Sequence, residues 1–491
     1  MQLFSLLVAC TDSDDKPDTG SVDSADSADS ADSVDTGESN DSGDTALEVV
    51  VDLQATAQMS PNISTVMTVV WTTDAPGTRV VEFGATAAYG RQTTDDGTTD
   101  TEHDVLVVGM KPSAEVHWRV RSMIDGVIHV SEDQVLTTGP ADPGLPPFHL
   151  DIATPGAFHG GLRLIPVSSE PNPLVLVDDD GEIVWWTFTE PGLTINQAFL
   201  DNDGAHILYL VTDSARNVDR GAMVRVSLAD PTHSEAIPLP LAHHSFVQMD
   251  DGHVIYLASD AREVDGETVV GDVIIEVDAD GSHPRPLFNT WDRWTPDFDI
   301  IRERTTNFYR YAMDWTHGNS LRYDPVTDTL LCSFHNIDAI MKMQMDGTVD
   351  WVLAGSAASP EADYTYAGEG DPFYDQHNAH LLPDGQLLLF DNGPYGLPPD
   401  YYSEVSQYAL DANSHTYSET WNFDWDQAVA TPLEGDVSRF ADDGNTLVNW
   451  GASGAWMEVT PAGDIVWQIT SKNGAFFAFG QHYPSLGGVI R

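Results

Sequence analysis

Apolar and polar residues alternate in short runs along most of the chain, and turns rich in Asp, Gly and Pro separate the runs. The clearest example is residues 374–393, Y-D-Q-H-N-A-H-L-L-P-D-G-Q-L-L-L-F-D-N-G, where two apolar runs flank Pro383-Asp384-Gly385. Proline presets φ and glycine reaches positive φ, so this triplet suits a tight reversal. The pattern predicts a β-hairpin whose open end carries a cluster of polar side chains.

This hairpin pattern is repeated along the chain. Acidic, Gly-containing turns lie between two apolar strands in Ala198–Leu210, Phe246–Leu257, Ala379–Phe390 and Ser438–Trp450, and less regularly in Ser320–Ser333 and Gly161–Val177. A second hairpin often follows and ends in a phrase such as D-G-T-V-D-W at residues 346–351, whose Trp is expected to pack between units. Two hairpins make a four-strand unit. Six units predict an all-β fold with a six-bladed β-propeller at residues 148–491.

Residues 47–141 contain short alternating strands and no helical pattern, which predicts a small β-sandwich. The phrases V-V-W-T-T-D-A-P-G-T-R-V-V-E-F-G and L-V-V-G-M-K-P-S-A-E-V-H-W-R-V-R-S resemble fibronectin type III modules. A Pro-rich link, Asp142–Pro147, follows this domain. The small β-sandwich holds no cluster of reactive side chains, so we expect this domain to be a spacer or a support.

The N-terminal segment predicts export and a lipid anchor. Residues 1–10 read M-Q-L-F-S-L-L-V-A-C and end in a match to the bacterial lipobox. In a lipobox, the cysteine (here Cys10) becomes the lipidated N-terminus after cleavage. The match departs from the usual signal in two ways, because the basic region is absent and the apolar run is short. Residues 11–46 are rich in Asp and Ser, cannot bury a core and predict a disordered acidic tether. We expect a periplasmic or cell-surface lipoprotein.

The overall charge excludes some partners. The 491 residues include 78 acids and 21 bases, for a formal net charge of -57. Nucleic acids need a basic footprint, so they are excluded, and a membrane is expected to be reached only through the lipid anchor. The two cysteines, Cys10 and Cys332, make no disulfide framework.

Histidines mark the candidate site. Residues just before the innermost strand of a propeller unit lie near the axis, and three successive units have histidine there: His243-His244, His317 and His377. Asn196 and Asp436 hold this position in two other units. Imidazole can act as a nucleophile, a proton shuttle or a metal ligand. A metal site would need three or four ligands with orienting carboxylates, and Asp314, Asp375, Asp391 and Asp436 could serve. The sequence contains no G-x-S-x-G phrase, which is the pattern typical of a serine nucleophile.

Three phrases around these histidines carry a family resemblance. They are A-H-H-S-F-V-Q-M-D-D-G-H-V-I-Y-L, D-W-T-H-G-N-S-L-R-Y-D and D-Q-H-N-A-H-L-L-P-D-G-Q-L-L-L-F-D-N-G. In order and spacing, residues 150–485 resemble the bacterial PAPS-independent arylsulfotransferases (aryl-sulfate sulfotransferases). The resemblance implies a propeller in which a central histidine takes a sulfuryl group from an aryl sulfate and passes it to a phenol. It implies small-molecule substrates and no cofactor.

Carried onto this chain, the resemblance makes His377 the nucleophile. It gives His317 and one of His243 and His244 the work of donating hydrogen bonds to the sulfuryl oxygens or moving protons. It also implies substrate contacts for His335, Asn319, Asn378, Asn196 and Asp436, and we expect Asn319 and Asn378 to orient the rings. Where the family has arginine in S-S-R, this chain has His335 in S-F-H, which has no permanent charge. Positive charge near the substrate is then expected from protonated histidines or from Arg163, Arg322 or Arg439.

Two other functions remain open from the sequence. One is a non-catalytic surface propeller that binds a ligand or a protein partner. The other is a metal-dependent hydrolase in the style of lactonases. The sequence predicts neither the identity of donor and acceptor nor the oligomeric state.

Overall fold

The computed structural model describes residues 49–169, 171–213, 219–304, 309, 312–356, 358–370, 372–394, 402–426 and 429–486. The predicted lipobox with Cys10 and the predicted tether lie outside the described residues. Within the described ranges, no helix combines the length and apolar character needed to cross a membrane.

The predicted all-β class is confirmed, since strands make up most of the described chain. The helices are short: α1 (Thr290–Arg293), α2 (Phe298–Arg304) and two single 3-10 turns at His335–Ile337 and Gly451–Ser453. Both α-helices follow one another between two strands of the third sheet described below, and no helical layer covers any sheet in the described ranges.

The N-terminal part consists of two sheets packed on one core. Its strands are β1 (Val49–Leu53), β2 (Ala55–Met59), β3 (Met67–Gly77), β4 (Val80–Gly84), β5 (Arg91–Gln92), β6 (Asp100–Val107), β7 (Glu115–Ile124), β8 (Val127–Ser131) and β9 (Gln134–Thr137). One sheet has the order β1-β8-β7-β4-β5, with β9 on β7, and the other has the order β2-β3-β6. Alternate residues are buried along β7, as the period-2 pattern predicts. The likeness to fibronectin type III stays a prediction.

Six further sheets follow along the chain. The first contains β11 (Leu162–Ser168), β12 (Pro173–Val177) and β13 (Ile183–Phe188), with β36 (Phe476–Phe477) and β37 (Gln481–Tyr483) paired to β11. The second contains β14 (Leu193–Leu200), β15 (His206–Asp213), β16 (Ala222–Ser227) and β17 (Ser234–Pro238). The third contains β18 (Ala242–Gln248), β19 (Val254–Val264), β20 (Glu267–Val277) and β21 (Arg285–Asn289), with β22 (Met313–Asp314) paired to β20.

The last three sheets have the same meander order. The fourth contains β23 (Gly318–Asp324), β24 (Thr329–Phe334), β25 (Ala339–Gln344) and β26 (Val349–Ala354). The fifth contains β28 (His377–Leu381), β29 (Leu387–Asp391), β30 (Glu404–Asp411) and β31 (Thr416–Asp424), with β27 (Thr365–Tyr366) paired to β31. The sixth contains β32 (Asp436–Arg439), β33 (Thr446–Asn449), β34 (Ala455–Val459), β35 (Ile465–Ser471) and the distant β10 (Phe148–Ala153).

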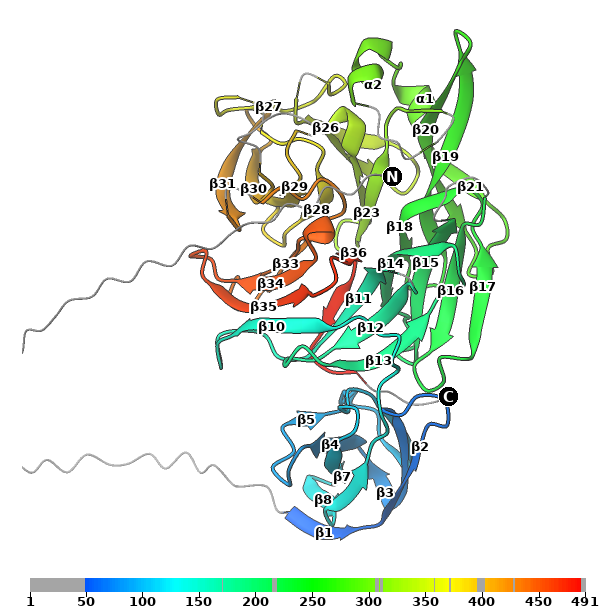
Figure 1. The fold of residues 1–491 in the computed structure, drawn as a ribbon, viewed down its shortest axis with the longest axis vertical. Coiled ribbons are helices and arrows are strands. Elements are labelled where there is room, and N and C mark those ends of the chain that lie inside the picture. The colour runs from blue at the N-terminus through cyan, green and yellow to red at the C-terminus, as the bar shows by residue number, and fades with distance from the viewer. Residues whose placement is uncertain are drawn as a thin grey trace, which may run out of the picture. The chain divides into compact units, whose positions relative to one another are not determined.

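The first strands of successive sheets pack side by side, from β11 to β14, β18, β23, β28 and β32. The two ends of this part are joined twice: β10 pairs with β35 of the last sheet, and β36 and β37 pair with β11 of the first. Figure 1 shows the cyan β10 beside the red strands β33 to β35. This topology brings the beginnings of the first strands toward one place. The six-bladed ring and the domain boundaries stay predictions.

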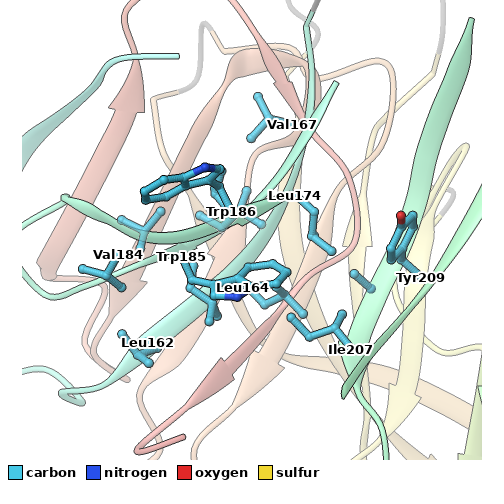
Figure 2. Close-up of a cluster of buried hydrophobic side chains, with 14 of the residues drawn as sticks. Leu162, Leu164, Val167, Leu174, Val184, Trp185, Trp186, Ile207 and Tyr209 are labelled. Carbon is cyan, nitrogen blue, oxygen red and sulfur yellow. The ribbon is translucent and has the colours of Figure 1, made fainter. Parts of the chain in front are cut away.

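Large apolar side chains fill the space between neighbouring sheets. In the cluster of Figure 2, side chains of β11, β12 and β13 meet Ile207 and Tyr209 of β15. Trp185 and Trp467, from the repeated D-G-x-V-x-W-like phrases, are fully buried. Their indole nitrogens donate hydrogen bonds to the Leu228 and Asp179 carbonyl oxygens, at 2.9 Å each, in the next sheet. Trp185 therefore fixes the first sheet against the second, and Trp467 fixes the sixth against the first.

Candidate functional site

The start of the first strand is irregular in the three sheets that carry the predicted histidines. The pairing register shifts there in β18, β23 and β28. His244, His317 and Asn378, at or beside these shifts, have positive φ values of 53°, 51° and 47°. Such a conformation costs a non-glycine residue about 1–3 kcal/mol, and bulges of this kind redirect side chains. The irregular backbone brings histidines of three sheets to one level.

Five histidine rings form a continuous row, which we call the histidine arc: His243, His244, His317, His335 and His377. Successive ring centroids lie 5.2, 4.7, 5.0 and 5.3 Å apart in that order. Each of the five residues is less than 8% exposed, the largest value being 7% for His317. The structure thus brings together all five histidines that the sequence singled out.

His377 is held in one tautomer by Asn392. Its Nδ1 lies 2.7 Å from Oδ1 of Asn392, whose Nδ2 donates to the carbonyl oxygens of Thr431 and Glu434 at 2.7 and 2.8 Å. The amide nitrogen is therefore engaged elsewhere, and the oxygen facing the ring must accept. Nδ1 of His377 carries the proton, and Nε2 keeps its lone pair.

The charge of His377 follows from its surroundings. Burial lowers its pKa well below the ordinary value of 6.5, and the neighbouring His335 lowers it further. The hydrogen bond to Asn392 opposes this shift only in part. The ring is therefore neutral at physiological pH, which is the form that can act as a nucleophile.

Two other rings of the arc have carboxylate partners. Nε2 of His243 lies 3.0 Å from Oδ1 of Asp272, and Nδ1 of His317 makes a short contact with Oδ2 of Asp314. All these side chains are buried. A buried carboxylate fixes the orientation of a histidine ring and stabilises the ring when it takes a proton. Asp314 was one of the acids that the sequence suggested, whereas Asp272 was not.

His335, which stands where the resemblance calls for arginine, is not a permanent cation. Its Nδ1 lies 2.8 Å from Oδ1 of Asn336 and 3.5 Å from Oδ1 of Asp375. Nδ2 of Asn336 donates to the carbonyl oxygen of Asp314, so its Oδ1 accepts from the ring. Burial lowers the pKa of His335, although Asp375 opposes the shift. The free site therefore holds His335 as a neutral ring.

An arginine that the sequence did not indicate approaches the arc from α2. Arg304 contacts both carboxylate oxygens of Asp338, and its Nη2 lies 2.5 Å from Oδ1 of Asp375. Burial alone would lower the pKa of Arg304, but the two carboxylates raise it. Asp375 thus lies between the guanidinium of Arg304 and the ring of His335. No motif marks Arg304, because only folding brings it to His335.

In the described part of the chain, neither predicted amide side chain makes a hydrogen bond to a ring of the arc, so our expectation that they orient the rings in this way is wrong in this structure. Nδ2 of Asn319 donates to the Gln376 carbonyl oxygen at 2.7 Å, which ties β23 to β28. Oδ1 of Asn378 accepts from Nε of Arg322 at 2.6 Å. Both side chains are bound by backbone or arginine, and Asn392 and Asn336 make the ring contacts instead.

Asp436 and Asn196 lie in two other sheets. Oδ1 of Asp436 lies 3.1 Å from Nη2 of Arg322, and burial raises the pKa of Asp436 to about 6. Oδ1 of Asn196 accepts from the hydroxyl of Thr212 at 2.8 Å. The first contact joins the first strands of the fourth and sixth sheets, and the second joins the first two strands of the second sheet. Neither residue makes a hydrogen bond to a histidine ring among the described residues.

Of the three arginines named from the sequence, only Arg322 adjoins predicted site residues. Arg163 pairs with Asp179 at 2.5 Å and lies 4.1 Å above the ring of Trp467. The guanidinium of Arg439 lies 4.6 Å from the ring of Trp421. These two guanidinium groups belong to packing between sheets, and Arg304 is the cation that adjoins the arc.

Two groups of side chains in the described part of the chain have a spacing suited to a metal ion: His159 with Asp442 and Asp443, and Asp201 with Asp203 and His206. Neither group includes a residue of the histidine arc. In the second group, Arg225 contacts both carboxylates and offsets part of their negative charge. The geometry of the arc is that of rings paired with carboxylates and amides.

Comparison with known proteins gives a family match. The model of the family "Arylsulfotransferase (ASST)" matches residues 152–475. Two curated relatives are similar: the arylsulfate sulfotransferase AssT of Escherichia coli O6:H1, 25% identical over 169 residues, and that of Lelliottia amnigena, 26% identical over 137 residues. The alignments cover 28% and 22% of this chain and 28% and 23% of those proteins.

Among solved structures, a protein of unknown function from Bacteroides thetaiotaomicron aligns over 86% of this chain and 98% of its own, at 11% identity and a TM-score of 0.38. The periplasmic gluconolactonase PpgL of Pseudomonas aeruginosa aligns over 65% of this chain and 99% of its own, at 11% identity and a TM-score of 0.36.

Proposed function

The chain belongs to the arylsulfotransferase family, and we propose that it transfers a sulfuryl group from an aryl sulfate ester to a phenol through a sulfated His377. The observation that carries the proposal is the fixed tautomer of His377. Its ring is neutral, its Nδ1 donates to Asn392, and its Nε2 has a lone pair. A neutral imidazole in this state is a nucleophile ready for attack on sulfur.

The reaction then has two balanced steps. In the first, the Nε2 lone pair of His377 forms a bond to sulfur, the bond from sulfur to the aryl oxygen breaks, and a phenolate leaves. In the second, the oxygen of the acceptor phenol forms a bond to sulfur, the bond from sulfur to Nε2 breaks, and the phenol proton is released. A covalent intermediate divides one difficult transfer into two easier ones.

The rest of the arc stabilises charge on the sulfuryl oxygens. His335 lies next to His377 in the row, at 5.3 Å between ring centroids, and His317 follows His335 at 5.0 Å. Neutral His335 has its proton on Nδ1, so it donates from Nε2 only after taking a second proton. An anion beside the ring favours that uptake, and Asp375 stabilises the resulting imidazolium. In place of a permanently charged guanidinium, this site thus has a ring, His335, that becomes positively charged when the substrate binds.

The test is sulfuryl transfer from p-nitrophenyl sulfate to a phenol by the purified protein. We expect release of p-nitrophenol by the wild type and its loss in His377→Asn. His380→Gln is the matched control, because His380 is another histidine of β28 outside the arc. Equal release by wild type and His377→Asn would refute the proposal.

Mass spectrometry of the donor-soaked protein separates catalysis from binding alone. The proposal expects a sulfated peptide that contains His377. Binding of the donor without that adduct would instead support a non-catalytic receptor, and activity that depends on a stoichiometric metal would support a hydrolase.

A further inference from the structure

A histidine at the junction of the first and sixth sheets faces two carboxylates. His159 lies in the connection from β10, which pairs in the sixth sheet, to β11, which belongs to the first. Asp442 and Asp443 lie in the turn between β32 and β33 of the sixth sheet. Nε2 of His159 lies 3.0 Å from Oδ1 of Asp442 and 3.8 Å from Oδ1 of Asp443. Segments 283 residues apart in the sequence thus bring three metal-ligand atoms together.

The other nitrogen of the His159 ring is already engaged by a buried acid. Nδ1 lies 2.8 Å from Oε1 of Glu458, which also accepts the backbone N–H of His159 at 3.1 Å. Glu458 is 0% exposed, and Phe440 stacks on the ring at 3.7 Å between centroids. A carboxylate accepts hydrogen bonds, so Nδ1 is the donor. Histidines that bind metals have this arrangement, in which one nitrogen donates to a carboxylate and the other faces the ion.

The spacing of the three atoms fits a tetrahedral transition-metal site. They all lie within 4.8 Å of one another. In a zinc site with bonds of about 2.0–2.2 Å, neighbouring ligand atoms are about 3.3 Å apart, a value between the two distances from Nε2. Imidazole is a ligand of Zn²⁺, whereas Ca²⁺ and Mg²⁺ prefer oxygen ligands alone. The side chains of Asp442 and Asp443 are 75% and 47% exposed, so an ion can enter and water can complete its coordination.

The second group with metal-ligand spacing, in the second sheet, shows what distinguishes this one. There Arg225 contacts both carboxylates, and its Nη2 lies 2.9 Å from Nδ1 of His206. A guanidinium thus takes the place that an ion would occupy. Among the described residues, no Lys or Arg side chain pairs with Asp442 or Asp443. The carboxylates at the junction therefore have no permanent cation, and a dication would supply that charge.

We propose that His159, Asp442 and Asp443 bind one divalent transition-metal ion such as Zn²⁺, with Glu458 as the positioning residue for the ring. Only the lone pair of Nε2 can be a ligand, so the ion takes the place of any proton on that nitrogen. The bound ion ties the connection between β10 and β11 to the sixth sheet and so stabilises the closure between the first and last sheets. The site includes no residue of the histidine arc, and the proposal is independent of the proposed function.

The test titrates Zn²⁺ into the full chain after dialysis against EDTA, with calorimetry as the readout. We expect one tight site in the wild type that is absent in His159→Gln and weakened at least 10-fold in Asp443→Asn. Glu458→Gln is expected to weaken it 10- to 100-fold, since that is the usual effect of losing an outer carboxylate. Zn²⁺ should raise Tm of the wild type and not of His159→Gln. Anomalous diffraction at the zinc edge should place the ion beside Nε2 of His159.

The controls separate this site from other acids and from catalysis. Asp203→Asn removes a carboxylate of the group that Arg225 occupies and is expected to keep the tight site. Asp443 is half-exposed, so Asp443→Asn still tests the site if a buried substitution fails to fold. Equal Zn²⁺ binding by wild type and His159→Gln, or equal loss in Asp203→Asn, would overturn the site. Loss of p-nitrophenol release in His159→Gln would overturn its structural role. A wild type that binds Zn²⁺ here but never forms the His377 adduct would support this site and refute only the proposed function.

Discussion

The contact between Asn392 and His377 offers the most direct test of the nucleophile. Asn392→Ala removes an acceptor for the ring and two donors, to the carbonyl oxygens of Thr431 and Glu434. Asn449→Ala is a matched control, because the Asn449 amide also donates to two backbone carbonyl oxygens, at 3.3 and 2.9 Å, and its oxygen contacts no ring.

The expected magnitudes follow from the number of hydrogen bonds lost. Each contributes a net amount of about 0.5–1.5 kcal/mol, so Asn392→Ala should lower the free energy of unfolding by about 1.5–4.5 kcal/mol and Asn449→Ala by about 1–3 kcal/mol. The one bond that distinguishes them is the bond to Nδ1 of His377. Its loss weakens the preference for the reactive tautomer by roughly 2- to 13-fold. Loss of ring position adds to this effect, so we expect loading of His377 to slow by about 10- to 100-fold.

The assay measures the burst of p-nitrophenolate in a stopped-flow experiment, with calorimetry for stability. Nitrogen chemical shifts of labelled histidine report the tautomer directly. Asn392→Asp adds a pH test: a carboxylate raises the pKa of His377, so loading should weaken at low pH and recover as the pH rises. Wild-type burst rates in Asn392→Ala, or a proton on Nε2 of wild-type His377, would refute the reasoning.

Four further predictions follow from contacts described above or from the printed sequence. Because burial lowers the pKa of His335 and keeps it neutral in the free site, binding of the donor should take up a proton, and KM for the donor should rise with pH. Calorimetric titration in buffers of different ionisation enthalpy measures the proton uptake, and a heat of binding that does not depend on the buffer would contradict it. Burial alone would lower the pKa of His159, but Glu458, at 2.8 Å, and a neighbouring carboxylate raise it. In the metal-free protein, the protonated ring therefore stabilises the folded protein fully below about pH 6.5, and this stabilisation is lost as the pH rises through the raised pKa. His159→Ala should therefore lower Tm more at pH 5 than at pH 9, and an equal drop would contradict this. Trp467→Ala should cost about 3–5 kcal/mol of unfolding free energy in denaturant titration, and a cost below about 1 kcal/mol would show that the indole does not fix the two sheets. Cys10→Ser should abolish labelling by radioactive palmitate in a bacterial host, and unchanged labelling would remove the predicted anchor.

The sequence predicted the part of the site that depends on repetition. Because each unit begins with the same strand, histidines at equal places in successive units could be aligned before any coordinates were known. His243, His244, His317 and His377 follow from that argument, and His335 follows from the family resemblance. The same argument cannot say which side chain orients a ring, since a register shift of one residue turns neighbouring side chains to opposite faces.

The errors have identifiable physical causes. Asn378 was expected beside the rings, but its positive φ lies within the register shift of β28 and its side chain contacts Arg322. Asn392 was within reach of prediction, because it lies across the mouth of the hairpin that contains His377. Arg304 and Asp272 were not, because no local pattern distinguishes a buried charged residue that meets the site from a short helix or from a distant strand of the same sheet.

The double closure between the first and last strands of the six-sheet part has a consequence for the order of folding. Thr470 of β35 and Asp151 of β10 are hydrogen-bonded although they are 319 residues apart in the sequence. A ribosome releases β10 long before it releases β35, so the nascent strand waits with an unpaired edge while five intervening sheets are synthesised. Contacts of such long sequence separation form late and slowly. Completion of the last sheet, and with it the first, is therefore the step at which translation, chaperones and proteases have the longest opportunity to act on this protein.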